Sequence, residues 1–277
     1  MDNKKKKLID HGFIPDIFKE QDLILGSANS LSGKVINLSR DWEPFLPPSE
    51  GQLRSGVETV SCVSFGLCNI IEIMSDLLYF SFQSPSEKNY SDRFLAINSG
   101  TTPRGNSVLK VADTLRHGGL VGEEALPFSS DIKSFSEYHS PKPLPRHLLN
   151  IGKKWTNQFN FGYEWVFNDS VPKKDRPNLI WNALQFSPVG VSVLAWIKDG
   201  NSYTKPKGAI DNHFTVIFGG EKGSHFTIFD SYPNSDGDYI KILPWNYDFG
   251  QAHKFSLEKK FEKEDNWFER FIKFFYQ

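Results

Sequence analysis

The run from Ser61 to Leu77 constrains the fold more than any other part of this sequence. Ser61 is a favourable N-cap residue, so Cys62 should lie in the first turn of a helix. The apolar residues that follow recur near the spacing of an α-helix: Phe65, Ile70, Ile73, Met74 and Leu77. The sequence therefore predicts a buried helix that begins at a cysteine.

The position of Cys62 has chemical consequences. The unpaired N–H groups and the partial positive charge of a helix N-terminus favour an anion, which predicts a lowered pKa for this thiol and a reactive thiolate. A structural interpretation is also open, because free cysteines are common in protein cores. Cys68 is the only other cysteine. Two cysteines six residues apart on one helix cannot pair without unwinding it, so the fold should not depend on disulfides, and a reducing compartment is expected.

Composition sets broad limits on function. The chain has 277 residues, of which 39% are hydrophobic and 23% charged, and a formal net charge of −1. This balance gives no electrostatic reason to expect nucleic acid or an acidic membrane as a partner. No apolar segment follows the basic run Lys4 to Lys7, so no signal peptide is expected, and no apolar run is long enough to span a membrane. The 24 Phe and 7 Trp predict aromatic packing or a surface that another protein covers.

Periodicity changes along the chain from helical spacing to alternation. Helices are expected at 91–97, 107–118, 146–155 and 176–184, and strands at 161–167, 189–196, 214–218, 226–229 and 239–243. This order predicts an α+β fold with two lobes. The expected divisions are an extended N-terminal segment (1–50), a helical lobe (51–140), a β-rich lobe (141–255) and a C-terminal amphipathic helix (256–277).

A predicted hairpin brings two titratable residues together. Gly219 to Ser224 should turn the chain back, so that His213, at the start of one strand, lies beside Asp230, at the end of the next. The carboxylate would then hold the imidazole through Nδ1–H and leave Nε2 to act on the Cys62 thiol. Each residue also has a structural interpretation: His213 as a satisfied strand residue and Asp230 as a turn former. His225 is a second candidate, but no carboxylate stands opposite it.

Four stretches together resemble the papain superfamily of cysteine peptidases. Ser61–Phe65 is similar to the family's nucleophile run, and Asp211–Gly219 resembles its histidine strand. Gly118–Phe128 and Asn182–Val191 resemble the passages from helix into "Gly-Leu…Glu…Tyr-Pro" and from helix into "Gly-Pro-Val". The stretches occur in the family's order, and the resemblance covers residues 43 to 245.

The resemblance implies a papain-like fold and hydrolysis of peptide or amide bonds through an acyl-enzyme. It implies that Cys62 is the nucleophile, His213 the general base and acid, and Asp230 the residue that orients it, where papain has Asn. The family's oxyanion-stabilising Gln stands six residues before the cysteine, where this chain has Gly56, so Gln52 is carried over tentatively. A peptide or protein is the implied substrate, and no cofactor or metal is implied. Residues 1–41 are too short and irregular for the family's helical inhibitory propeptide.

A narrower resemblance concerns the setting. Glu58–Phe65 and Ser91–Ala96 look like papain-like proteins encoded in bacteriophage genomes. This would imply the cytoplasm of a bacterial host or a virion, with a phage-particle protein as a partner of the aromatic C-terminal helix. Two other functions remain open: a catalytically silent structural or virion protein on the same fold, and acyl transfer to an amine.

Overall fold

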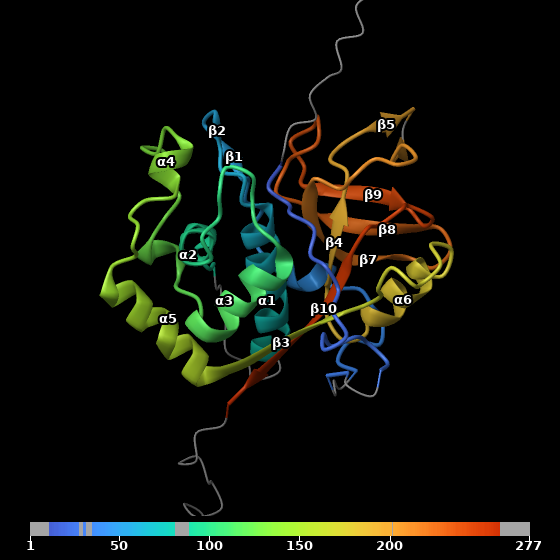
Figure 1. Cartoon of the computed structure of the whole chain (residues 1–277), viewed down its shortest axis with the longest axis horizontal. Coiled ribbons are helices and arrows are strands. Elements are labelled where there is room, and N and C mark those ends of the chain that lie inside the picture. Colours follow the sequence, from blue (N-terminus) through green and yellow to red (C-terminus); the bar gives the residue numbers. More distant parts are fainter. Residues whose placement is uncertain (1–10, 28–29, 32–34, 81–88, 201, 261–277) are drawn as a thin grey trace, which may run out of the picture.

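The computed structural model describes residues 11–27, 30–31, 35–80, 89–200 and 202–260, with no description of the side chains of residues 79 and 80. Helices α1 to α5 lie on one side of the molecule, and a twisted antiparallel sheet with helix α6 beside it lies on the other (Figure 1). This is the α+β arrangement with two lobes that the sequence predicts. The extended segment near the N-terminus, blue in Figure 1, passes between the two sides.

The long helix α1 (Cys62–Phe80) lies at the centre of the molecule (Figure 1). Every residue from 61 to 75 is buried, as expected for a helix packed on all sides. The Ser61 hydroxyl donates to the carbonyl of Thr59 rather than capping the helix, while the Ser61 carbonyl accepts the first helical hydrogen bond, from Phe65. The predicted helix thus begins at Cys62.

Shorter helices surround one side of α1. They are α2 (Asp92–Asn98), α3 (Val108–Gly118), α4 (Phe135–Tyr138) and α5 (Arg146–Gln158), with single 3-10 turns η1 (Glu43–Phe45) and η2 (Glu123–Ala125). Ser91 and Ser107 cap α2 and α3 through their side chains. The capped helix predicted after residue 106 therefore begins at Val108. Helix α5 packs against α3. The boundary between the two lobes, expected at residue 140, stays a prediction.

The second side is a six-stranded sheet with the order β3-β10-β4-β7-β8-β9, in which all neighbours are antiparallel. Its strands are β3 (Phe159–Trp165), β4 (Val189–Val193), β7 (His213–Glu221), β8 (His225–Phe229), β9 (Ile240–Pro244) and β10 (Ala252–Lys259). Helix α6 (Arg176–Ala183) connects β3 to β4, and two small pairs lie outside the sheet: β1 (Leu53–Arg54) with β2 (Val57–Glu58), and β5 (Lys198–Asp199) with β6 (Ser202–Tyr203).

Strand β10 differs from the sequence expectation. It pairs with both β3 and β4, and its residues 256 to 259 fall in the part of the chain predicted to begin a C-terminal helix. The sequence of this strand does not show the alternation of apolar and polar residues that predicts a strand, because a buried position is taken by a lysine. Lys254 is buried and pairs with Glu164 at 2.7 Å. The remainder of the predicted C-terminal helix lies outside the described residues.

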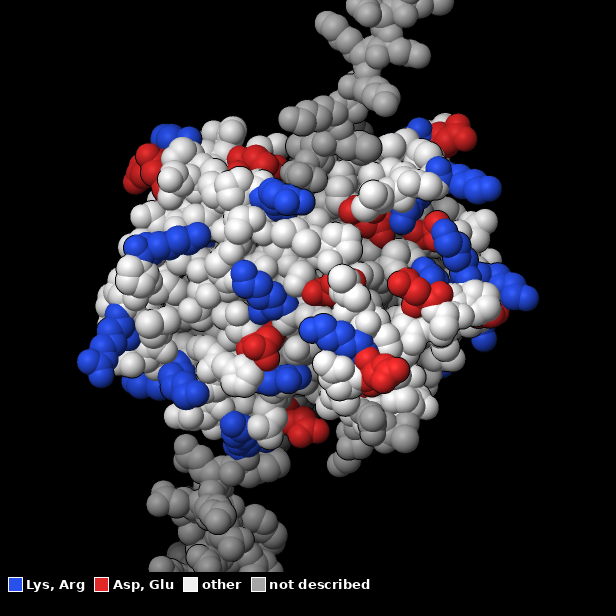
Figure 2. Space-filling view, in the orientation of Figure 1, with Lys and Arg blue, Asp and Glu red and all other residues white. Residues whose placement is uncertain are grey.

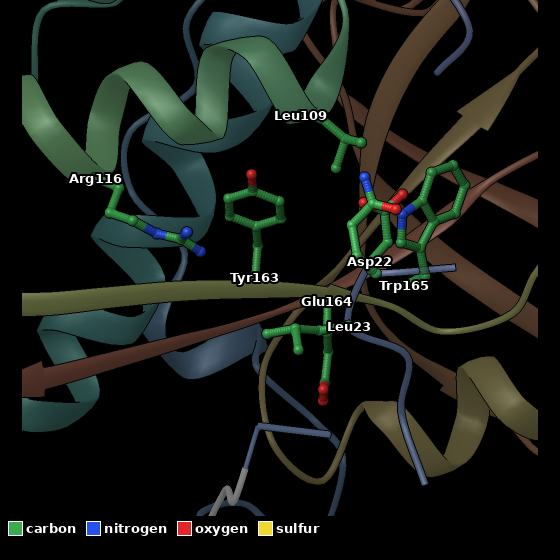
Figure 3. A pocket seen from close by; sticks show the side chains of 8 residues that line it. Asp22, Leu23, Leu109, Arg116, Tyr163, Glu164 and Trp165 are labelled. Atoms are coloured by element: carbon green, nitrogen blue, oxygen red, sulfur yellow. The ribbon is translucent and has the colours of Figure 1, made fainter. Parts of the chain in front are cut away.

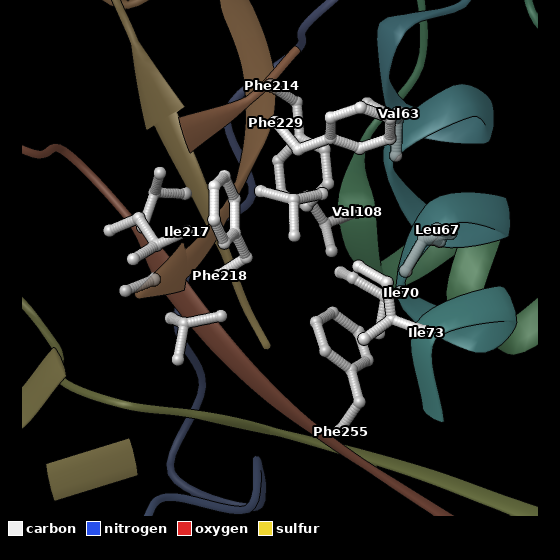
Figure 4. Close-up of a cluster of buried hydrophobic side chains, with 14 of the residues drawn as sticks. Val63, Leu67, Ile70, Ile73, Val108, Phe214, Ile217, Phe218, Phe229 and Phe255 are labelled. Atoms are coloured by element: carbon white, nitrogen blue, oxygen red, sulfur yellow. The ribbon is translucent and has the colours of Figure 1, made fainter. Parts of the chain in front are cut away.

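The main core lies between α1 and the sheet. Side chains of α1 such as Leu67 and Ile70 point toward Phe214, Ile217 and Phe255 of the strands (Figure 4). The approach is close, because a Cβ at Gly66 would lie 2.7 Å from the Phe214 ring. This packing holds the first turn of α1 against the first residues of β7.

The described surface carries both signs of charge. Figure 2 shows Lys and Arg side chains interspersed with Asp and Glu on the visible face. In the described part of the chain, none of the helices combines the length and the apolar character that a membrane crossing requires.

Candidate active site

Cys62 lies where the two sides of the fold meet. It is the first residue of α1 and has no exposed surface. The backbone N–H of Phe214, the second residue of β7, points at its thiol. Because His213 is the residue before Phe214, the cysteine and the histidine are brought to the same place from opposite sides.

His213 and Asp230 form a buried pair. The hairpin β7–β8 places the start of β7 beside the residue that follows β8, and His213 Nε2 lies 2.5 Å from Asp230 Oδ1. The same oxygen accepts the backbone N–H of Ser231 at 2.9 Å. The carboxylate is therefore fixed by both side-chain and backbone donors.

The ring nitrogen that meets Asp230 is not the one expected from the sequence. We expected Nδ1 to face the carboxylate, but Nε2 does so, and Nδ1 of His213 has no hydrogen-bond partner among the described residues. A hairpin fixes which residues are neighbours, whereas the side-chain rotamer decides which nitrogen points across. Nδ1 is thus the nitrogen left to exchange a proton.

Gln52 joins this group despite standing ten residues before Cys62. The strands β1 and β2 form a tight hairpin that takes up the additional residues, with Ser55 and Gly56 at positive φ in its turn. The Gln52 side chain is fully buried, and its Oε1 accepts the Ser231 hydroxyl at 2.7 Å. The amide nitrogen is thereby oriented away from Ser231.

Two residues that the sequence interpretation did not single out hold the Gln52 amide. Its Nε2 donates to Glu58 Oε1 at 2.8 Å and to the Tyr232 hydroxyl at 2.7 Å. The Tyr232 hydroxyl donates in turn to Glu58 Oε2 at 2.5 Å. The only local signal for Tyr232 is that it follows Asp230 by two residues.

Aromatic rings exclude water from the imidazole. The rings of Tyr232 and Trp196 lie 5.1 and 5.8 Å from that of His213, and the His11 ring lies 6.1 Å away. None of the side-chain surface of His213 or Asp230 is exposed. Electrostatic interactions in this group are therefore strong.

Residues 11 to 13 lie across the group. The N–H groups of His11 and Phe13 donate to the Asn212 carbonyl, and the His11 carbonyl accepts Gln52 Nε2 at 3.1 Å. On the other side, a Cβ at Gly12 would lie 2.3 Å from the carbonyl oxygen of Val60. This segment has no helix, yet it reaches from the residue before His213 to the loop before Cys62.

The pKa of the Cys62 thiol differs from the expectation. Burial raises it above the ordinary range, and the nearby Asp230 and Glu58 carboxylates raise it further, which outweighs the Phe214 and Val63 N–H groups. In this covered arrangement desolvation dominates over the helix N-terminus. For Asp230, burial also raises the pKa, but His213 and Lys241 beside the carboxylate bring the net pKa below its usual value.

The remaining candidates lie elsewhere. His225 stands at the other end of β8, far along the strand from Asp230. The expectation that no carboxylate stands opposite it was wrong, because Glu221 pairs with His225 across the turn and its Oε2 lies 4.0 Å from the His225 Nδ1. Cys68 is a second free, buried cysteine, two turns along α1. Within the described ranges, no three His, Cys, Asp or Glu side chains converge as a metal site would require.

Comparisons with known proteins bear on the fold. No family model matches the sequence, and neither does any curated protein. Among solved structures, xylellain, a cysteine protease from Xylella fastidiosa, is similar with a TM-score of 0.59 at 19% identity, covering 95% of this chain and all of that one. The digestive procathepsin L 3 of Tenebrio molitor follows with a TM-score of 0.55 at 16% identity, covering 90% of this chain and 77% of that one.

A third similar structure is the cysteine protease CMS1MS2 of Carica candamarcensis in complex with E-64. Its TM-score is 0.51 at 14% identity, over 78% of this chain and 96% of that one. The chain has the papain-like fold. Its similarity to xylellain agrees with the bacterial type of the sequence resemblance. No comparison supports a bacteriophage or virion setting, which stays a prediction.

The molecule also has a pocket away from the candidate active site. A cavity of about 160 Å³ lies between α3 and β3, with Arg116 4.5 Å from the centre of the Tyr163 ring (Figure 3). Asp22, Leu109 and Trp165 also line it. None of Cys62, His213, Asp230 or Gln52 does, so the pocket is separate from the candidate active site.

Proposed function

We propose that this papain-like chain is a cysteine peptidase, a thiol hydrolase of peptide or amide bonds. The observation that carries the proposal is the 2.5 Å pair between His213 Nε2 and Asp230 Oδ1, with Nδ1 unengaged among the described residues and with the N–H of the next residue, Phe214, at the Cys62 thiol. In this assignment Cys62 is the nucleophile, His213 the acid and base, and Asp230 the residue that orients the ring.

The reaction follows from these roles. Nδ1 of His213 takes the thiol proton, and the sulfur of Cys62 attacks the substrate carbonyl. The protonated imidazole then gives its proton to the leaving amine, and the acyl-enzyme forms. Water, deprotonated by Nδ1, releases the acid product and regenerates the thiol.

Gln52 is the proposed oxyanion donor, together with the Cys62 backbone N–H. Three acceptors lie within hydrogen-bond distance of the two N–H groups of its Nε2: Glu58 Oε1, the Tyr232 hydroxyl and, in the covered arrangement, the His11 carbonyl. The His11 carbonyl oxygen thus occupies the place beside the Gln52 amide that the oxyanion would take in this assignment. Substrate binding on this assignment requires residues 11 to 13 to leave.

Labelling with a thiol-directed epoxide, followed by mass spectrometry, tests the nucleophile. We expect modification at Cys62, none at Cys68, and loss of all labelling in Cys62→Ala but not in Cys68→Ala. In parallel, a peptide library should be cleaved by the wild-type protein and not by Cys62→Ala. Labelling of neither cysteine, in the wild type and in a variant whose N-terminal segment is loosened, would contradict the proposal.

The main alternative is a catalytically silent protein on the same fold. The complete burial of Cys62 and its raised pKa favour it. The same experiment decides between the two, because a silent protein would cleave no peptide after its N-terminal segment is loosened. An amine-acceptor assay distinguishes hydrolysis from acyl transfer.

A further inference from the structure

A buried lysine completes the charge arrangement around Asp230. Lys241 lies on β9, is only 3% exposed, and its Nζ is 2.8 Å from Asp230 Oδ2. The ammonium also donates to the Tyr232 carbonyl and lies 5.2 Å from the centre of the Trp196 ring. One carboxylate oxygen thus faces the imidazole and the other faces a fixed positive charge.

The sequence pattern of β9 makes this placement unusual. Ile242 is 58% exposed, while its neighbour Lys241 points inward. Burying an ammonium carries a desolvation penalty of several kcal/mol, which only a close counter-charge offsets. The strand therefore presents its lysine to Asp230 at the expense of an apolar contact.

The electrostatic effect on His213 follows from the distances. A carboxylate 2.5 Å from an imidazole strongly favours the charged imidazolium, above all in a dry site. Lys241 acts in the opposite direction, because its ammonium makes the Asp230–Lys241 pair neutral overall. The imidazole is oriented by a carboxylate without carrying the full influence of an uncompensated negative charge.

We propose that Lys241 is a positioning residue that sets the basicity of His213 through Asp230, so that the ring can both accept and release a proton. This inference rests on the proposed peptidase function for its purpose, but the titration of His213 can be measured without any substrate.

The other charged or titratable groups near the pair are Cys62 at the start of α1, Glu58 on β2, Tyr232 after β8, and His11 from the N-terminal segment. None of them is substituted when position 241 is changed. A difference between variants with and without the lysine therefore reports on Lys241.

Histidine Cε1 resonances in the full chain give the test. His213→Gln assigns the His213 signal, which is then titrated in the wild type, Lys241→Met, Asp230→Asn and the double variant. We expect Lys241→Met to raise the His213 midpoint by at least about one pH unit. The double variant should likewise titrate higher than Asp230→Asn, and Lys241→Arg should titrate near the wild type.

Lys254→Met is the matched control. Lys254 is equally buried and pairs with Glu164 at 2.7 Å, toward the opposite edge of the sheet from β9. Its replacement should leave the His213 midpoint unchanged. If Lys241→Met does not fold, the comparison of Asp230→Asn with the double variant still tests the lysine. Both lack the Asp230 charge, so they differ only in the presence of Lys241.

Equal His213 midpoints with and without Lys241, in either pair of variants, would overturn the inference and leave Lys241 as a structural ion-pair partner. Failure of the proposed function is a separate result: no peptide is cleaved by any variant, whatever the His213 midpoints. Where hydrolysis is measured, the acid limb of kcat/KM should shift upward with the midpoint in Lys241→Met, because the imidazole must be neutral to take the thiol proton.

Discussion

At the scale of single residues, Gln52 is the clearest case in which contacts replace a motif. Its distance along the chain from Cys62 departs from the family spacing, yet the β1–β2 hairpin returns it to the site. There Ser231, Glu58 and Tyr232 fix both ends of its amide. An amide held from both ends is preorganised, which is the property that an oxyanion donor needs.

Replacing Gln52 by Ala should lower kcat about 100- to 1,000-fold with little change in KM, because one oxyanion donor is worth about 3 to 4 kcal/mol in the transition state. Tyr232→Phe is the comparison: it keeps the ring and the Gln52 side chain but removes the hydroxyl, and should lower kcat less. Steady-state kinetics on one peptide substrate measure both. A Gln52→Ala variant with the kcat of the wild type would assign the oxyanion to other donors.

The residues of the candidate site differ in how far the sequence predicts them. Hairpin spacing was sufficient to bring His213 to Asp230, because antiparallel pairing fixes neighbours. It could not give the ring nitrogen, which depends on a rotamer. Lys241 had no signal at all, since a lysine between two isoleucines in a short strand normally lies on the exposed face.

At the scale of elements, the segment from His11 to Phe13 lies between the residue before His213 and the loop before Cys62. Apart from a single parallel bridge between Phe13 and Asn106, it lies outside the helices and strands. Its position depends on hydrogen bonds to Asn212, Asn106 and Gln52. Its approach to the loop before α1 requires glycine, because Gly12 has φ +105 and backs directly onto Val60. Residues 11 to 13 therefore form an extended cover over the candidate site.

Gly12→Val should therefore loosen the segment and expose the Cys62 thiol. The new side chain would meet the Val60 carbonyl and adopt a strained φ, so we expect alkylation of Cys62 by iodoacetamide to become at least about tenfold faster, which corresponds to about 1.4 kcal/mol of lost docking. Gly26→Val is the matched control, since Gly26 also has positive φ but has no atom within 4 Å of its Cβ position. Equal alkylation rates in the two variants would show that the segment does not limit access.

Strand β10 shows where element prediction failed. Alternating apolar residues predicted the β7–β8 hairpin well, because its inward positions are Phe, Val and Ile. In β10 both faces are buried at His253 and Lys254, and the fold satisfies Lys254 with Glu164 from β3. A buried charge pair is a tertiary feature, so neither strand alone carries the signal.

At the scale of the whole molecule, the change from helical to alternating periodicity was sufficient for the fold class. The long apolar helix needs a cover on every side, and only the shorter helices together with the sheet provide one. The sequence could not predict that several carboxyl groups would be buried together beside α1. Glu72 is 4% exposed and Asp92 is 5% exposed, with Glu50 and Glu123 close by.

This cluster of buried carboxyl groups, which includes Glu72 and Glu123, should make the fold less stable as the pH rises. Burial raises the pKa of Glu72 to about 8 and that of Glu123 to about 7, with the Glu50 carboxylate acting in the same direction. In the unfolded chain these groups ionise near pH 4.5, so between that pH and 8 the folded state holds more protons. The free energy of unfolding contributed by Glu72 then falls by an amount on the order of 5 kcal/mol across this range.

Glu72→Gln should remove much of this fall. Gln keeps an oxygen to accept the Tyr90 N–H, which now donates to Glu72 Oε1 at 2.7 Å, but it has no proton to lose. Urea unfolding at pH 5, 7 and 9 measures the effect, and we expect similar stabilities of variant and wild type at pH 5 and a more stable variant at pH 9. Asp113→Asn, at an exposed carboxylate on α3, is the control and should follow the wild type. Parallel pH curves for Glu72→Gln and the wild type would mean that Glu72 ionises in the folded protein as easily as in the unfolded chain, which its burial beside Asp92 and Glu50 argues against.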